Sequence, residues 1–384
     1  MAKRSLVASW ARLFNRGSKV LAKAAVRQQK ALLKPVKPAR KAAAAQPKPL
    51  VQATPRVARP AVKKRPAPLT RAGRIAKPAL DAIAAQHRFP KARGDWLPGL
   101  AIGPAGTRRF TLYRPAALRG PPQGMALGQP LAPAPLVVML HGCAQNGRGL
   151  AISSRMHRLA DRHGFFVLYP EQDTMAHPQG CWRWYELRSG HAQAEAQTLQ
   201  LMLDQVGLRH AIDRTRVAVA GLSAGAGMAA LMATREPLRY AAVVMHSGVA
   251  PGSGRSTATG LQAMRGGGSV ALPPGVVLPP LMVLQGSADR VVDPANGRAA
   301  AEAWAQAAGA RAGKPRNLQR GTRHAMTVTD YRRARRTMVR LVEIQGLGHA
   351  WSGGDAAQSY SDPAGPDASR LAWAFMQACF RRAA

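Results

Sequence analysis

The sequence predicts an α/β domain over residues 96–384, in which a mostly parallel central sheet carries helices on both faces, behind a basic N-terminal arm over residues 1–95. Two observations support this prediction. From about residue 96, short apolar runs that end in Gly or Pro alternate with stretches of helical pattern. The charge is also uneven along the 384 residues, because residues 1–90 hold 22 of the 56 Lys and Arg but only one acid, Asp81.

The arm is predicted to be mostly disordered. Residues 30–90 are rich in Ala, Pro and Lys, and they contain too little apolar surface to offset the entropy of ordering a chain. Prolines every few residues also exclude helix and favour an extended chain. Near residues 4–33, in contrast, apolar side chains recur at roughly helical spacing among Arg and Lys, which predicts a short amphipathic helix. Its apolar residues are Leu6, Val7, Trp10, Leu13, Phe14, Val20 and Leu21.

The charge of the arm and its lack of targeting segments give expectations about partners and location. A charge of +21 in residues 1–90 suits the arm to bind an anionic surface, a granule or nucleic acid non-specifically. The longest apolar run near the start, Leu6–Ala8, is too short for a secretory signal, and no stretch reaches the roughly 18 apolar residues of a membrane span. A cytoplasmic location is therefore expected, and export or an organelle transit peptide is the alternative.

Six apolar runs are the predicted strands of the sheet. Continuous apolar runs of this length are typical of strands that are buried on both faces. The strands are expected at residues 135–142, 165–170, 216–221, 241–248, 281–286 and 338–346. Helical patterns predict helices at residues 194–212, 224–236, 299–310 and 369–382.

A nucleophile motif lies where the strand at 216–221 meets the helix at 224–236. Gly221-Leu222-Ser223-Ala224-Gly225 is the only G-x-S-x-G in the chain. A strained turn between strand and helix needs small residues two before and two after the serine, and it exposes the hydroxyl above the first turn of the helix. The context predicts Ser223 as the nucleophile of an α/β-hydrolase fold, rather than an incidental serine in a Gly-rich connection.

A serine nucleophile needs a histidine as general base, and in this fold the order along the chain is Ser, acid, His. Downstream of the nucleophile, His246 would leave only Glu236 as the acid, so we reject it. His324 falls in the basic segment 320–336, which we expect to be a surface segment before the last strand. His349 follows the last strand in a Gly-rich loop at the carboxyl edge of the sheet, and it is the predicted base.

Two aspartates follow the strand at 281–286 and compete for the role of the acid. Asp289 comes three residues after the strand and so lies near the active edge of the sheet. Asp293, followed by Pro294, is typical of a turn or helix cap. Asp289 is therefore the predicted carboxylate that orients the base.

Two backbone N–H groups should form an oxyanion hole beside the nucleophile. Ala224, directly after the serine, supplies one. The loop after the strand at 135–142 supplies the other, with Cys143 the better candidate and Ala144 its neighbour. His141 is expected to be structural and to pack under this loop.

Three aromatic residues lie downstream of that loop. They could line an acyl or aromatic substrate pocket or belong to the core, and the sequence favours neither interpretation. They are Trp182, Trp184 and Tyr185.

Several motifs in the same order resemble the poly(3-hydroxybutyrate) depolymerase family of esterases, relatives of the feruloyl esterases. The likeness covers about residues 105–380. The motifs are LHGCAQN at 140–146, GCWRWY at 180–185, GLSAGA at 221–226, QGSADRVVDPANG at 285–297, GLGHAWSGG at 346–354 and SYSDPAGPDASRLAWAFM at 359–376.

The resemblance implies an α/β-hydrolase fold and hydrolysis of carboxylic esters through an acyl-enzyme on Ser223, without metal or cofactor. The family's aspartate corresponds to Asp289 and its oxyanion donor to Cys143. In many relatives the cysteines that match Cys143 and Cys181 are bridged. Such a bridge, with Cys379 free, would suit an oxidising compartment, whereas three reduced thiols would suit the cytosol.

The sequence also departs from the family pattern. Gln285 stands where relatives usually carry a histidine, which is not the base. Secreted depolymerases carry a signal peptide and a C-terminal polymer-binding module, neither of which is seen here. Hydroxybutyrate or hydroxyalkanoate oligomers, intracellular polymer, or a feruloyl or acetyl ester are therefore the expected substrates. The rival hypothesis is a polyanion-binding or granule-binding protein on an inactive hydrolase scaffold.

Overall fold

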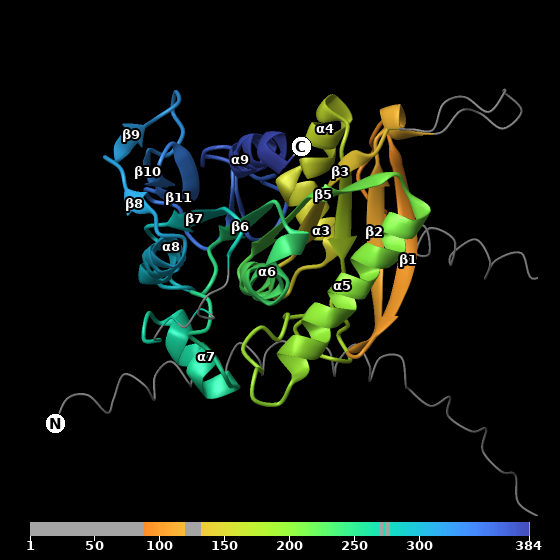
Figure 1. Ribbon diagram of the computed structural model, residues 1–384, viewed down its shortest axis with the longest axis horizontal. Helices are drawn as coiled ribbons and strands as arrows, with labels where there is room; N and C mark the ends of the chain where they lie inside the picture. Colours follow the sequence, from red (N-terminus) through yellow and green to blue (C-terminus); the bar gives the residue numbers. More distant parts are fainter. Residues whose placement is uncertain (1–87, 120–131, 269, 271, 273–276, 384) are drawn as a thin grey trace, which may run out of the picture. The chain divides into compact units, whose positions relative to one another are not determined.

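In the computed structural model of the protein, residues 88–119, 132–268, 270, 272 and 277–383 are described (Figure 1). The chain divides into two units, Met1–Pro68 and Leu69–Ala384, and all of the described residues lie in the second. The predictions made for residues 1–87, including the amphipathic helix near 4–33 and the disorder, fall outside the described residues. Within the described part of the chain, no helix combines the length and apolar character that crossing a membrane requires.

An 11-stranded sheet lies at the centre, in the order β1-β2-β4-β3-β5-β6-β7-β11-β10-β8, with β9 paired to β10. The middle strands, from β4 to β11, pair in parallel, and the strands outside them pair antiparallel. The strands are β1 Asp95–Gly103, β2 Gly106–Arg114, β3 Ala134–Leu140, β4 Phe166–Pro170, β5 Ile212–Leu222, β6 Ala242–His246, β7 Leu281–Gly286, β8 Arg311–Ala312, β9 Arg316–Leu318, β10 Met326–Arg333 and β11 Arg336–Ile344. A separate short pair consists of β12 Trp351–Ser352 and β13 Ser361–Asp362.

Helices cover both faces of this sheet. Helices α5, α6 and α8 pack on one face, and α3, α4 and α9 pack on the other (Figure 1). The helices are α3 Gly147–Ser154, α4 Met156–His163, α5 His191–Arg209, α6 Ala224–Arg235, α7 Thr257–Met264, α8 Ala295–Ala307 and α9 Ala368–Ala383, with short 3₁₀ turns η1 Ala116–Leu118 and η2 Pro237–Arg239.

Strand β3 shows why the central strands are apolar throughout. Its side chains alternate between the two faces, so Val138 joins the core under α5, α6 and α8, while Val137 and Met139 join the core under α3, α4 and α9. Each of these three side chains is buried. The six predicted strands correspond to β3, β4, β5, β6, β7 and β11, and the prediction of a mostly parallel sheet with helices on both faces is confirmed.

The segment 320–336 was expected to be a surface segment, and that prediction is wrong for its middle part, where Met326, Val328, Thr329 and Asp330 are buried. Residues Met326–Arg333 form β10, which pairs antiparallel with β11. Met326 and Val328 are buried in the core, whereas the arginines at both ends of the segment are exposed. The basic composition hid a two-residue alternation that is typical of a strand.

Three buried histidines make the stability of the fold dependent on pH. Burial lowers the pKa of His141 and His157 to about 4 and that of His246 to about 3. Between these values and the ordinary pKa of 6.5, the unfolded chain binds protons that the folded chain excludes. The free energy of unfolding is expected to fall by about 2 kcal/mol per ring between pH 7 and pH 5. The buried carboxyl of Glu195, whose pKa burial raises, offsets a part of this loss.

Urea unfolding at pH 7 and pH 5 measures this dependence. A His157→Leu variant should reduce the difference in unfolding free energy by about 2 kcal/mol, because the contribution of one buried ring is gone. The matched control His163→Leu alters an exposed ring on the same helix and should keep the difference unchanged. Equal unfolding free energies at the two pH values would contradict the expectation.

Candidate active site

Ser223 stands on a strained turn between β5 and α6. Its backbone has φ 56° and ψ −118°, a conformation that residues other than glycine rarely adopt. The turn leaves no room for a side chain at Gly221 or Gly225. A Cβ on Gly221 would lie 2.2 Å from the carbonyl carbon of Gly225, and a Cβ on Gly225 would lie 2.2 Å from the carbonyl oxygen of Leu140. These contacts give the physical reason for both glycines of the G-x-S-x-G motif.

The Ser223 hydroxyl is free to react. The residue is half-buried, and among the described residues its Oγ has no hydrogen-bond partner. The backbone N–H of Ser223 donates to the His246 carbonyl at 2.9 Å, which fixes the turn to β6. The hydroxyl therefore lies at the carboxyl end of β5, at the N-terminus of α6, where the helix dipole favours a developing negative charge.

Asp289 and His349 are joined by a hydrogen bond of 2.8 Å from His349 Nδ1 to Asp289 Oδ2. The other carboxylate oxygen accepts the backbone N–H groups of Val291 and Val292, both at 2.9 Å. Burial raises the pKa of Asp289, but the bond from His349 and these two N–H groups outweigh burial and hold the pKa below its usual value. Asp289 is thus a fixed carboxylate, and its hydrogen bond holds the Nδ1 edge of the His349 ring.

Gln285 also contacts this carboxylate, with its Nε2 3.4 Å from Asp289 Oδ2. The same amide nitrogen lies 3.4 Å from the carbonyl oxygen of Val292. Gln285 therefore packs beside the acid and not beside the nucleophile.

His246 connects the segments that carry the three candidate residues. Strand β6 lies between β5 and β7 in the sheet, and Leu222 is paired with His246 in the register. The ring Nε2 of His246 accepts the backbone N–H of Ser352 at 3.1 Å, so it holds the loop that follows His349. The ring is fully buried, which fits its rejection as the base. Sequence reasoning missed this packing role, because no motif marks it.

The loop after β3 supplies two amides near the nucleophile, and the structure distinguishes them. A Cβ on Gly142 would lie 3.4 Å from the Cβ of Ser223, so the loop lies against the turn. The Ala144 N–H donates to the Gln179 carbonyl at 2.7 Å and is already used. The N–H groups of Cys143 and Ala224 have no acceptor among the described residues. These two amides are the available donors for an oxyanion.

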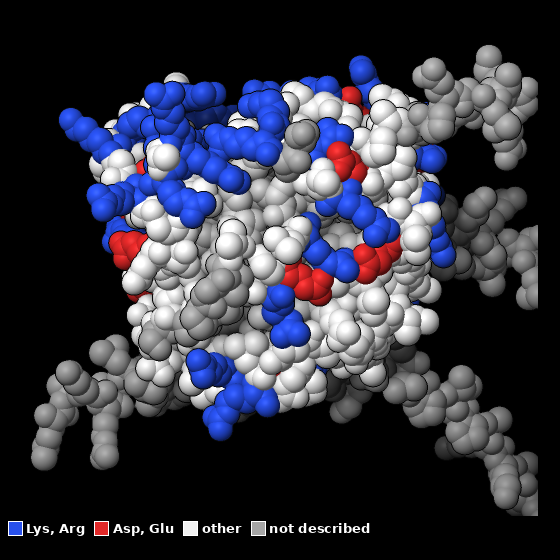
Figure 2. Space-filling model, in the orientation of Figure 1, with Lys and Arg blue, Asp and Glu red and all other residues white. Residues whose placement is uncertain are grey.

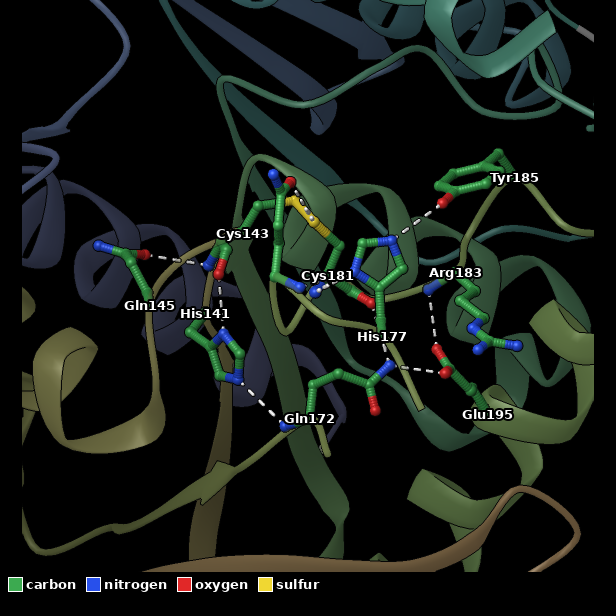
Figure 3. The surroundings of a disulfide bond; sticks show 11 residues. His141, Cys143, Gln145, Gln172, His177, Cys181, Arg183, Tyr185 and Glu195 are labelled. Carbon is green, nitrogen blue, oxygen red and sulfur yellow. Dashed lines mark hydrogen bonds between the residues drawn. A yellow bond between two sulfur atoms is a disulfide. The ribbon is translucent and has the colours of Figure 1, made fainter. Parts of the chain in front are cut away.

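His141 fixes the peptide group that carries the Cys143 N–H (Figure 3). Its Nδ1 donates to the Gly142 carbonyl at 2.8 Å, and this carbonyl belongs to the same peptide group. Its Nε2 accepts the backbone N–H of Gln172 at 3.1 Å, which sets the tautomer of the neutral ring. The expectation that His141 lies under the loop agrees with this geometry.

A disulfide joins Cys143 to Cys181, and a buried carboxylate holds the second cysteine in place (Figure 3). The Gln172 side chain donates to the Cys181 carbonyl at 3.1 Å and to Glu195 at 2.6 Å. The other oxygen of Glu195 accepts the Arg183 N–H at 2.8 Å. The sequence offered only a weak signal for this network, namely the acid Glu195 between two alanines of α5.

Replacing Cys181 by alanine is expected to lower kcat for ester hydrolysis by up to about 100-fold, because displacement of a positioned catalytic group by about 1 Å has an effect of that size. The loss should appear in kcat more than in KM. Cys379→Ala is the matched control, since Cys379 is a buried free cysteine on α9, in the core on the opposite face of the sheet from Cys181. A Cys181→Ala variant with unchanged kcat would show that the bridge does not position the loop.

The three aromatic candidates have different environments. Trp182 is fully buried and its ring lies 5.3 Å from that of His141, so it belongs to the core under the loop. Trp184 is 9% exposed and packs edge-on against the half-buried Tyr185 at 5.4 Å. For Trp182 the structure favours the core interpretation over the pocket interpretation.

The alternative acid and base lie elsewhere. Asp293 accepts the Ala295 N–H at 2.9 Å, two residues further on, which is the geometry of a turn ahead of α8. His324 pairs with Asp362 at 3.2 Å, and neither contacts Asp289. The structure therefore brings together His349 and Asp289, and leaves Asp293 and His324 outside this pair.

The mostly parallel sheet with helices on both faces is an α/β-hydrolase fold. It carries a strained serine turn, a histidine–aspartate pair after later strands and two amides without an acceptor among the described residues. Residues 117–302 match the model of the family described as esterase PHB depolymerase, which confirms the resemblance that the motifs indicated. The matched range includes Ser223, Cys143 and Asp289, and His349 lies after it.

Individual relatives agree with this family. The chain is 34% identical to poly(3-hydroxyalkanoate) depolymerase C of Paucimonas lemoignei over 181 residues, or 43% of each chain. It is 27% identical to a probable acetylxylan esterase A of Aspergillus clavatus over 203 residues, which are 48% of this chain and 65% of the relative. The chain thus spans about half the length of the relatives that it matches.

A solved structure supports the fold. The acetyl xylan esterase from Aspergillus awamori superimposes with a TM-score of 0.52 at 20% identity, over 67% of this chain and 94% of that one.

Proposed function

We propose that the chain is a serine esterase that hydrolyses carboxylic esters through an acyl-enzyme on Ser223. The observation that carries the proposal is the 2.8 Å bond between His349 and Asp289, at the same edge of the sheet where the strained turn presents the Ser223 hydroxyl. His349 Nε2 has no hydrogen-bond partner among the described residues, so it is available as a base.

The reaction follows from these atoms. His349 takes the Ser223 proton as the hydroxyl oxygen attacks the ester carbonyl, and Asp289 stabilises the imidazolium. The Cys143 and Ala224 N–H groups bind the oxyanion. His349 then protonates the leaving alcohol, and afterwards it activates the water that releases the acid and restores Ser223.

The proposed substrates are oligomers or polymer of a 3-hydroxyalkanoic acid. The name of the Paucimonas lemoignei relative supports this choice. An acetyl ester is the second candidate, because the Aspergillus relatives are named acetylxylan esterases and one of them shares the fold. A feruloyl ester is the third candidate.

Initial rates on hydroxybutyrate oligomers, amorphous polyhydroxybutyrate, acetylated xylan and a feruloyl ester test the substrate class, with Ser223→Ala as the blank in each assay. A kcat/KM for hydroxybutyrate oligomers at least tenfold above the others would support the first choice. A higher kcat/KM for acetylated xylan or the feruloyl ester would replace it, and no Ser223-dependent hydrolysis in any assay would reject the esterase.

The basic arm is proposed to attach the enzyme to an anionic surface, granule or nucleic acid through charge alone. Its charge of +21 over residues 1–90 supports this. A peptide of residues 1–90 should lose affinity for such a surface as NaCl is raised, because salt screens exposed charges. Binding that is unaffected by salt would exclude a purely electrostatic attachment.

The disulfide favours an oxidising compartment outside the cytoplasm over the cytoplasmic location first expected, because thiols in the cytosol are kept reduced. Of the three cysteines in the chain, only Cys379 should react in a thiol titration of the denatured protein taken from its natural source. One thiol per chain is therefore expected, and three would contradict the proposed compartment.

A further inference from the structure

A second concave site lies away from the serine site. It is a cavity of about 610 Å³ between α4, the start of α9 and the loop from β9 to β10, and its lining does not include Ser223, Asp289 or His349. Its volume is in the range of small-molecule sites. Among its described lining residues, Asp367 is the only carboxylate. Six arginines line it, namely Arg155, Arg158, Arg162, Arg320, Arg323 and Arg370.

Three of these arginines are held by the protein itself. Arg155 bonds the Gly353 carbonyl, Arg323 bonds the Gly365 carbonyl, and Arg370 lies 3.4 Å from Asp367. The other three, on α4 and in the β9–β10 loop, are exposed, and they have no ion pair or side-chain hydrogen bond among the described residues. They are Arg158, Arg162 and Arg320.

The surroundings do not neutralise this charge. Residues 311–340 contain ten Lys and Arg and one acid, Asp330. That acid is buried and already bonded to Arg316 and Arg340, with Arg332 at 3.4 Å. Figure 2 shows Lys and Arg gathered over the strands β8 to β11 and over α9. Like charges so concentrated repel one another unless an anion lies between them.

We propose that the cavity binds an oligophosphate, either free or as a cluster of phosphate headgroups on a lipid surface. A guanidinium group presents a planar fork of N–H donors that matches phosphate oxygens in bidentate pairs. Several unpaired guanidinium groups in one cavity fit an anion with several charges better than a single carboxylate. Apart from His324, no aromatic ring is among the described lining residues, so nothing there would stack on a nucleobase.

Titration calorimetry of the full chain with sodium tripolyphosphate in 150 mM NaCl tests the site. The variant Arg158→Gln/Arg162→Gln/Arg320→Gln should bind at least tenfold more weakly. A matched control, Arg311→Gln/Arg333→Gln/Arg335→Gln, removes the same charge from exposed arginines outside the cavity and should change the affinity less than twofold. Since the arm is intact in both variants, its own binding is a common background.

An equal loss of affinity in the two triple variants would overturn the proposal, because it would show attraction by total charge. Retained hydrolysis of a nitrophenyl ester and an unchanged melting temperature verify that the variants are folded.

Hydrogen exchange on the unmodified chain gives a test without substitution. Tripolyphosphate should slow exchange in residues 155–163 and 318–326, and no protection there would overturn the site.

Vesicles of phosphatidylglycerol, with phosphatidylcholine vesicles as the blank, distinguish the two sources of phosphate. Loss of both tripolyphosphate and vesicle binding in the cavity variant assigns the site to headgroups. Loss of tripolyphosphate binding alone assigns it to a free oligophosphate.

Discussion

Ser223→Ala should lower kcat for a short-chain nitrophenyl ester by about 10⁶-fold, the size of effect seen when a triad nucleophile is removed. The reason is that no other hydroxyl stands on the strained turn at the end of β5, so the acyl-enzyme cannot form. KM should change little, because the oxyanion donors are left intact. Steady-state rates of the purified variant, against the uncatalysed rate, measure the loss.

The control for this variant is Ser189→Ala, which removes an exposed serine hydroxyl ahead of α5. It should keep wild-type kcat. A Ser223→Ala variant that retains more than a few per cent of the activity would assign hydrolysis to another group of the protein.

Asp289→Asn should lower kcat by about 10⁴-fold, because an amide in place of the carboxylate allows the wrong tautomer of the base. The carboxylate of Asp289 accepts four hydrogen bonds, which come from His349, Gln285, Val291 and Val292. The asparagine side chain can accept from the backbone N–H groups and so keep the loop in place, but its NH₂ group would then face His349 Nδ1. The loss should therefore be in kcat, with little change of melting temperature.

Asp293→Asn is the matched control, since asparagine can also accept the Ala295 N–H in such a turn. It should leave kcat within about twofold of the wild type, because Asp293 lies outside the His349–Asp289 pair. If Asp293→Asn lowered kcat strongly and Asp289→Asn did not, the acid would be Asp293. The hydrogen bond between Asp289 and His349 would then have no role in catalysis.

Much of the central sheet could be predicted from the sequence, because strands buried on both faces leave continuous apolar runs such as 281–286. The outer strands could not. Strand β10 ends in two arginines, Arg332 and Arg333, and the hairpin of β1 and β2 exposes apolar residues such as Ile102. The local pattern therefore did not separate strand from loop.

The candidate site was also predictable from the sequence only in part. Ser223, Asp289 and His349 follow strand ends, and the sequence predicts them from these positions together with their order along the chain. The residues that hold them are distant in sequence and have no motif. His246 supports Ser223 from the next strand, and Gln172 links His141 to Glu195 across the disulfide loop. Contacts of this kind depend on tertiary packing, so they become visible only in the folded chain.

The choice of the oxyanion donor in the loop after β3 required the structure. The sequence favoured the N–H of Cys143 as the second oxyanion donor, with that of Ala144 beside it as the alternative. The bond from the Ala144 N–H to Gln179 removes that amide, and the bond from His141 to Gly142 orients the peptide of Cys143. A choice between adjacent amides requires knowledge of their partners.

Covalent labelling tests the assignment of the nucleophile most directly. The full chain is treated with a fluorophosphonate, digested and analysed by mass spectrometry, beside the His349→Ala variant. The expected result is one phosphonylated residue, Ser223, at the stoichiometry of one per chain in the wild type, and labelling slowed by more than a hundredfold in the variant, since the base that activates the hydroxyl is gone. Labelling at another residue, or equally fast labelling of the two proteins, would contradict the assignment.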